Sequence, residues 1–443
     1  MASFRGGGAV RIAEMTMRWS NLHQIRNYIR SSLWVVPLVT MPFAFLLTRL
    51  LRWIDPWFDW NFLSLSTKGA EATLQLVVTA TLSFVVFTFG SLLVAIQVAS
   101  AQMTPRIIAT TLLRNSVVKY TVSLFIFTLL FALTSQNRLD GSVPELVVFV
   151  GASLGLCCFA AFFYLIDYAS RLLRPISILA HVGHEGLAVI ASVYPDLSAG
   201  PASPGGTHKR QRPERIITHQ GTSGTVLAIN IDAIKAQAER SNGIVEFVPQ
   251  VGDFVSVDEP LFNLYGGASK IDDDLLRSTL AFGSERTMEQ DPTFAFRIVV
   301  DIALKALSQA INDPTTAVLS IDQLHRMLRS VGRRHLRTDE ILDRSGQLRV
   351  ICRTPNWEDF VWLSFSEIRA CGSNNLQIAR RLRSMIENLI DTLPEHRHLA
   401  LRQELSLLDR DIEKHFTYRE ELALARIADS QGLGGRSNAK SPD

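Results

Sequence analysis

The sequence predicts an α-helical membrane domain of four transmembrane helices, followed by a cytosolic α+β domain with a small β-module and a helical C-terminal region. The first observation behind this is the run after Glu71, which reaches Ala99 without a charged residue. About 20 apolar residues cross a bilayer, so this run is long enough. The second is a change near Tyr168, after which the chain has the composition of a soluble protein.

Four apolar runs are long enough to be transmembrane helices, at about Leu33–Leu51, Thr73–Ala99, Val117–Thr134 and Glu145–Tyr168. Basic residues concentrate before the first run, between the second and third, and after the fourth. Because Lys and Arg are enriched in cytoplasmic flanks, both termini are predicted to be cytosolic. The tryptophans Trp57 and Trp60 are then expected near the outer surface.

The second run carries a polar stripe, which consists of Thr81, Thr88, Ser91 and Gln102 on or near one helical face. Small and hydroxyl side chains on one face allow close helix packing. The same residues would also suit the wall of a water-filled path. No charged residue lies deep in any run, which argues against a pump for a charged substrate but leaves a passive pore open.

The chain is predicted to divide into six segments, and the second of them is the four-helix membrane domain. The first is a cytosolic N-terminal flank, the third a membrane-proximal helix and flexible linker, the fourth a small β-rich module, the fifth a mostly helical domain and the last a disordered tail. Their ranges are 1–31, 32–170, 171–214, 215–266, 267–428 and 429–443.

Two charged features of these segments need an interpretation. The membrane-proximal helix contains His181, His184 and Glu185, a spacing that suits either a metal or plain surface, and we predict no metal. In the fifth segment, Arg380, Arg381 and Arg383 are predicted to form a solvated helical face.

The most distinctive chemistry lies between Phe282 and Ala317, where two helices are predicted to begin with the same Asp-Pro signal. The candidate ligand-binding residues there are Glu285, Arg286, Gln290, Asp291, Asn312, Asp313, Thr315 and Thr316. They can form caps and a charge network that docks helices. They can also bind an anion at the helix N-termini, or a divalent cation between carboxylates.

Other classes of function find little support in the sequence. The net charge of +3 is too small to indicate nucleic acid binding. The four cysteines have no disulfide or metal-ligand spacing, which fits reduced thiols. No P-loop, dinucleotide fingerprint or catalytic motif is present, so we predict no cofactor and no enzymatic activity.

Several of these motifs together resemble one family of bacterial integral membrane proteins, domain-of-unknown-function family 2254. The resemblance rests most on Gln290-Asp291-Pro292 and on Ile311–Ala317 (INDPTTA). It also includes Val94–Gln102 with Thr104-Pro105-Arg106, Gly252–Val255 and Glu285-Arg286-Thr287. It implies a multi-pass protein of the bacterial cytoplasmic membrane, and it implies little about activity.

Two functions therefore compete. The first is a membrane protein with a cytosolic regulatory or binding domain that acts as an oligomeric channel or transporter-like protein. Four kinked helices make a poor pore alone, so copies of the chain would share one, and the expected partners are the lipid bilayer and a homo-oligomer. The second is a membrane-anchored sensor or scaffold whose cytosolic domain binds a ligand or partner. An enzyme acting on a phosphorylated substrate is a third alternative with less support.

Overall fold

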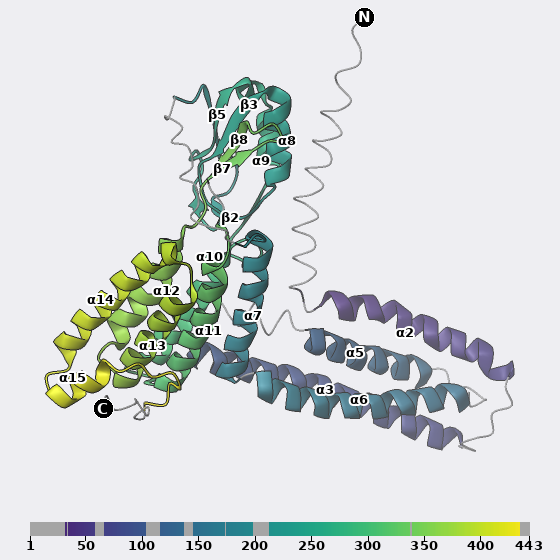
Figure 1. The fold of residues 1–443 in the computed structure, drawn as a ribbon. Helices are drawn as coiled ribbons and strands as arrows, with labels where there is room; N and C mark the ends of the chain where they lie inside the picture. Colours follow the sequence, from purple (N-terminus) through teal and green to yellow (C-terminus); the bar gives the residue numbers. More distant parts are fainter. Residues whose placement is uncertain are drawn as a thin grey trace, which may run out of the picture. The chain divides into compact units, whose positions relative to one another are not determined.

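The computed structural model describes residues 32, 34–57, 66–102, 116–136, 145–172, 174–197, 212–336 and 339–434. The chain forms two compact units (Figure 1). We call the part from Asn27 to Ile178 the span unit, and the part from Leu179 onward the α+β unit. Each is described by itself.

The span unit contains four long helices, and α5 is central because it contacts the other three. The helices are α2 (Val35–Ile54), α3 (Thr67–Gln102), α5 (Ser116–Gln136) and α6 (Glu145–Leu172), with a short 3-10 turn, η1 (Asp55–Trp57), after α2. The helices α3, α5 and α6 contain the last three predicted runs in full, and α2 contains the first run from Val35 onward. Of the two tryptophans expected near the outer surface, Trp57 is exposed and Trp60 lies outside the described residues.

Two glycines let α6 approach α3 closely. A Cβ atom added at Gly151 would lie 2.8 Å from Leu74 Cδ2, and one at Gly155 would lie 2.9 Å from Val77 Cγ2. The two glycines are four residues apart on one helical face, the spacing that membrane helices use for close packing. The contact between α3 and α6 therefore depends on the absence of side chains at these positions.

Five described helices, not four, are long and apolar enough to cross a membrane by length and composition. The fifth is α7 (Pro175–Val193), which the sequence analysis predicts as an amphipathic membrane-proximal helix. The prediction of four spans therefore undercounts the helices that qualify. The reason is physical, because an apolar face that packs on other helices raises mean hydropathy as much as a lipid-facing surface does.

Within the α+β unit, one face of α7 is buried against two other helices. Its buried residues include Leu179, Val182 and Ile190, while His181 and His184 are exposed. A Cβ at Gly183 would meet Gln323, and one at Gly186 would meet Ala295 and Met327. Since Gly183 and Gly186 are level with Gln323 and Met327, α7 runs parallel to the helix that carries them.

Two small sheets form the β part of this unit. A five-stranded sheet has the order β1-β5-β3-β8-β7, in which only the β3–β8 pair is parallel. A three-stranded antiparallel sheet has the order β4-β2-β6. The strands are β1 (Arg215–Thr218), β2 (Gly224–Ile229), β3 (Gly243–Phe247), β4 (Phe254–Val255), β5 (Pro260–Gly266), β6 (Leu280–Gly283), β7 (Glu340–Leu342) and β8 (Leu348–Cys352).

Distant segments share the core of these sheets. β3 alternates buried and half-buried residues along Gly243–Phe247, as expected for a strand with one face in a core. Val245 pairs with Val350, and both belong to one cluster with Phe247, Phe262 and Leu264. The β-module therefore extends beyond the predicted range 215–266, since β6, β7 and β8 complete its sheets. Three short helical segments accompany them, α8 (Ile231–Ser241), η2 (Gly267–Lys270) and α9 (Asp273–Arg277).

The remaining helices pack into a bundle. They are α10 (Pro292–Ala306), α11 (Pro314–Gly332), α12 (Trp357–Gly372), α13 (Leu376–Thr392), η3 (Glu395–Arg397), α14 (His398–His415) and α15 (Arg419–Ala425). The chain is extended at Phe416 and Tyr418, which separates α14 from α15.

The predicted solvated face of α13 is wrong. Arg380 has an exposed fraction of 0% and Arg383 of 8%. Arg380 donates hydrogen bonds to the carbonyl oxygens of Ile427 (3.0 Å) and Gly434 (3.1 Å), and Arg383 pairs with Asp409. These guanidinium groups are buried where carbonyls and carboxylates, most of them from later segments, pair with them.

The predicted tail is hydrogen-bonded to α13 as far as Gly434. The buried Asp429 carboxylate accepts backbone N–H groups of Gln431 (3.0 Å), Gly432 (2.9 Å) and Gly434 (2.7 Å). Burial raises the pKa of this carboxyl, but the three N–H groups and Arg380 outweigh burial, so its pKa is lowered from 3.8. Residues 435–443 lie outside the described residues.

We predict that Asp429→Ala lowers the free energy of unfolding by about 2 kcal/mol, since it removes charge-assisted bonds and leaves buried N–H groups unpaired. A lowered carboxyl pKa stabilises the fold above the unfolded-state value, and this contribution disappears as the pH falls through the folded-state value. The difference in unfolding free energy between the unaltered protein and Asp429→Ala should therefore become smaller as the pH is lowered. Thermal unfolding of the detergent-purified protein at several pH values measures it. Asp391→Ala, at an exposed aspartate of α13, is the control, and an equal loss there would contradict the prediction.

Candidate functional site

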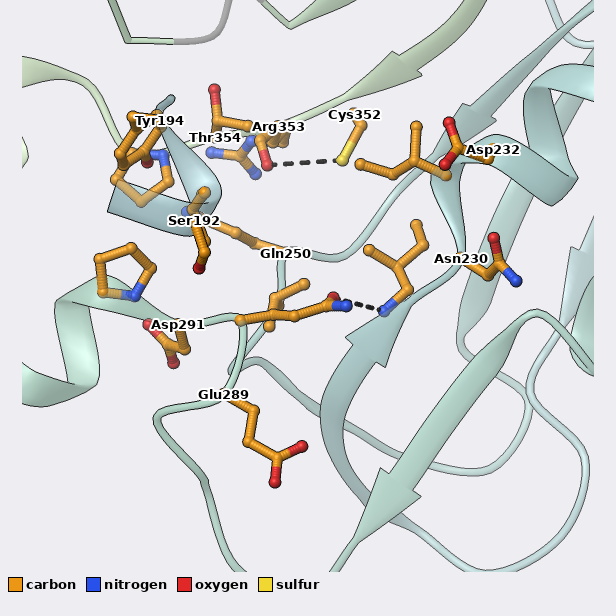
Figure 2. A pocket seen from close by; sticks show the side chains of 17 residues that line it. Ser192, Tyr194, Asn230, Asp232, Gln250, Glu289, Asp291, Cys352, Arg353 and Thr354 are labelled. Atoms are coloured by element: carbon orange, nitrogen blue, oxygen red, sulfur yellow. Dashed lines mark hydrogen bonds between the residues drawn. The ribbon is translucent and has the colours of Figure 1, made fainter. Parts of the chain in front are cut away.

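A cleft of about 460 Å³ lies inside the α+β unit, where strands end and helices begin (Figure 2). It is formed by the end of α7, the β2–α8 junction, the turn after β3, the start of α10 and the segment after β8. The lining residues are Ser192–Tyr194, Ile229–Asp232, Gln250, Val251, Glu289–Pro292 and Cys352–Pro355.

Three helices begin at the edge of this cleft. Asn230 caps α8 by accepting the N–H of Ala233 at 3.1 Å, and Asp291 caps α10 by accepting that of Phe294 at 3.1 Å. Asn356, directly after the lining residue Pro355, caps α12 through a reciprocal pair of bonds with Asp359. Because helix N-termini carry partial positive charge, the three starts favour electron-rich groups in the cleft.

Gln290 joins the helical bundle to the β-module. Its Oε1 atom accepts the backbone N–H of Ile229 at 3.0 Å, which Figure 2 shows as a dashed line across the cleft floor. Ile229 is the last residue of β2, and Gln290 precedes the cap of α10. This bond fixes the relation between two walls of the cleft.

The neighbouring Asp291 is the most constrained ionisable group in the cleft lining. Its side chain is 3% exposed and pairs with Arg286 Nε. It also accepts the Thr293 hydroxyl at 2.5 Å, and Arg286 donates a second bond to Thr293 Oγ1 at 2.9 Å. A buried carboxylate is tolerated only when it is paired and hydrogen-bonded, and here both conditions are met.

Gly252 brings a third motif to the same place. It has a φ angle of +95°, a conformation that favours glycine. A Cβ atom there would lie 2.5 Å from Asp291 Oδ2 and 2.5 Å from Arg286 Nε. The motifs Gly252–Val255, Glu285-Arg286-Thr287 and Gln290-Asp291-Pro292 therefore meet in space, although the sequence separates them by up to forty residues.

The other predicted ligand-binding residues lie elsewhere. Asp313 caps α11 and accepts both the N–H of Thr316 (3.1 Å) and its hydroxyl (2.5 Å). Fifteen residues of α10, a length of roughly 22 Å, separate this cap from Asp291. Asn312 and Thr315 are exposed at that end. Glu285 is exposed and lies outside the cleft lining. Within the predicted set, the structure brings Arg286, Gln290 and Asp291 together and places the second Asp-Pro motif at the other end of the helix.

Two residues of the polar stripe of α3, Thr81 and Thr88, are buried inside the span unit, with exposed fractions of 0% and 2%. The Thr81 hydroxyl donates to the carbonyl of Val77 at 2.7 Å, whereas the buried Thr88 hydroxyl has no hydrogen-bond partner among the described residues. Ser91 is exposed and bonds to the carbonyl of Thr88, and the side chain of Gln102 lies outside the described residues. Burial of Thr81 and Thr88 among packed helices favours the packing interpretation.

The histidines of α7 form one contact, an exposed pair between His181 Nε2 and Glu185 Oε1 at 3.4 Å. Among the residues that the structure describes, no three His, Cys, Asp or Glu side chains lie close enough together to hold a metal ion.

Sequence reasoning did not identify several cleft residues, notably Tyr194, Asp232, Gln250 and Arg353. Each stands in a different segment without a motif of its own. The available signals were the cap residues Asn230 and Asn356, which mark helix starts but do not show that the starts share a cleft.

Several apolar helices long enough to cross a membrane, joined to an α+β unit, define a predicted membrane protein. The profile described as "Predicted membrane protein (DUF2254)" matches residues 30–388, and the chain belongs to this family. Uncharacterised proteins of Mycobacterium bovis and Mycobacterium tuberculosis are similar, each 25% identical over 385 residues, which cover 81% of this chain and 71% of the relative. No solved structure matches.

We predict that Gly252→Ala destabilises the protein more than Gly221→Ala does, by about 1–3 kcal/mol. Both glycines have positive φ angles, so both variants incur backbone strain. Only at Gly252 would the new Cβ also collide with Arg286 and Asp291, since nothing lies within 4 Å of the Cβ position at Gly221. Thermal unfolding of both variants measures the difference, and equal losses would show that the close approach at Gly252 is unimportant.

Proposed function

We propose that this protein is a membrane-anchored sensor, whose α+β unit binds a small polar molecule in the cleft and conveys binding to the membrane helices through α7. One observation carries the proposal. The residues Ser192–Tyr194, which end α7 and follow it, line the cleft, while only two residues separate Pro175, at the start of α7, from the end of α6. A change at the cleft wall therefore acts on an element that continues directly from a membrane helix.

The lining favours a ligand that combines an anionic group with hydrogen-bond donors. Arg353 is exposed and supplies the cationic side chain of the lining, while Asp232 and Glu289 supply carboxylates. In Figure 2 the side chains of Arg353 and Glu289 lie on opposite sides of the cleft. The helix starts add attraction for the anionic end.

Rigid packing supports transmission through α7. Its buried face contacts α10 and α11 through Gly183 and Gly186, where side chains would not fit. At its far end, Arg334 donates hydrogen bonds to the carbonyls of Tyr194 and Pro195. These contacts, on the buried face and at the C-terminal end of α7, favour movement of the helix as a rigid body over local deformation.

The same packing supports four membrane spans with both termini in the cytosol. Although α7 is apolar enough to cross a bilayer, its buried face belongs to the α+β unit. The four helices of the span unit then cross a bacterial cytoplasmic membrane, with the basic flanks inside.

Of the two functions, the geometry favours a membrane-anchored sensor or scaffold over an oligomeric channel or transporter. Thr81 and Thr88, two residues of the polar stripe that suggested a water-filled path, are buried within a single copy of the chain. A pore shared between copies would need another polar face. The channel stays a prediction, which passage of ions by the reconstituted protein would support.

We expect one or more of ATP, GTP or inorganic phosphate to raise the unfolding temperature of the detergent-purified protein. A ligand that binds only the folded state stabilises it by about 2.7 kcal/mol at a hundredfold excess over its dissociation constant. Arg353→Ala should abolish the shift, whereas Arg402→Ala, at an exposed arginine of α14, should retain it. No shift with any of these probes, or equal loss in both variants, would argue against the cleft as their site.

The orientation of the spans in the membrane can be tested separately. We predict that Trp57→Cys reacts with a membrane-impermeant maleimide added to intact cells, because Trp57 is exposed in η1, after α2, at the end that is predicted to face outward. The native exposed Cys371 of α12 should react only after the membrane is permeabilised. The unmodified protein controls for labelling of Cys157, and the reverse order of reactivity would invert the topology.

A further inference from the structure

A groove opens on the surface of the span unit between α2, α3 and α5. Its volume is about 290 Å³, and every side chain that lines it is apolar. The floor consists of Leu92, Val118 and Val122, which belong to one buried cluster. The rim includes Trp34 and Leu38, both more than half exposed.

The groove starts at the end of the spans and runs inward. Trp34 directly precedes α2, and Val118 lies in the first turn of α5. The lining continues to Met41 and Ile126, seven and eight residues further, which is roughly 10–12 Å along the helices. Tryptophan is the residue that membrane proteins place at the lipid–water boundary, so the groove leads from that boundary into the hydrocarbon region.

We propose that this groove holds one acyl chain of a bilayer phospholipid. A polar ligand would lose its hydrogen bonds to water there and find no partner among the apolar side chains. Acyl chains form the medium around the spans, and dispersion contacts with fixed walls favour one chain staying in place. The proposal concerns the span unit and is independent of the cleft in the α+β unit.

The volume of the groove suits a single acyl chain. Hydrocarbon carbons pack about 4 Å apart, so 10–12 Å of a single chain occupies roughly 150–200 Å³. The groove volume of about 290 Å³ accommodates one such chain.

The test uses the full-length protein in phosphatidylcholine–phosphatidylglycerol vesicles that contain a phospholipid with a photoreactive diazirine in its acyl chain. After illumination, labelled peptides are identified by mass spectrometry. We expect label at Trp34–Met41 and Val118–Ile126. Leu38→Trp places a larger side chain at the rim of the groove. It should lower this labelling about tenfold, because the acyl chain then loses its contacts along one wall.

The matched control is Leu46→Trp, the same substitution on the same helix. Leu46 is 61% exposed and Leu38 is 51% exposed, but Leu46 lies outside the groove. It should leave groove labelling unchanged, and unfolding temperatures confirm that both variants are folded. Uniform labelling of groove and exposed surfaces, equal loss in both variants, or crosslinks to a second copy in place of lipid would each overturn the proposal.

Discussion

The buried carboxylate of Asp291 meets three requirements at once, since it caps α10, pairs with Arg286 and accepts the hydroxyl of Thr293. A charge taken out of water needs all such partners in place. The loop before α10 therefore has one geometry, and Gly252 must remain without a side chain to allow it. Because that loop also presents Gln290 to the end of β2, the cleft exists only where this network is complete.

The chain uses apolar helices for two different purposes. The helices α2, α3, α5 and α6 expose large apolar side chains, whereas α7 buries one face against α10 and α11. Mean hydropathy does not distinguish these cases, because it averages around the helix. The packing face of α7 combines large apolar side chains with Gly183 and Gly186, which lie against Gln323 and Met327 of α11.

Two charged residues of the bundle show where prediction from the local sequence pattern fails. Arg380 and Asp429 stand in segments that sequence reasoning assigns to a solvated face and a disordered tail. Arg380 donates hydrogen bonds to carbonyls near the C-terminal end, and Asp429 holds that end in a turn by accepting the N–H groups of its own segment. The partners of Arg380 lie about fifty residues away, beyond the reach of helix-surface or composition rules.

The sequence by itself determined the apolar helices, the helix starts at Asp291-Pro292 and Asp313-Pro314, and the presence of a β-rich module, because capping and hydrophobic periodicity act over a few neighbouring residues. Only the tertiary structure decided that the two Asp-Pro motifs lie at opposite ends of α10 and that Tyr194, Asn230, Gln250 and Arg353 share a cleft with Asp291. Parallel pairing of β3 with β8 brings residues a hundred positions apart together, as Val245 with Val350. Contacts of that kind arise from packing of a whole core, which no local signal encodes.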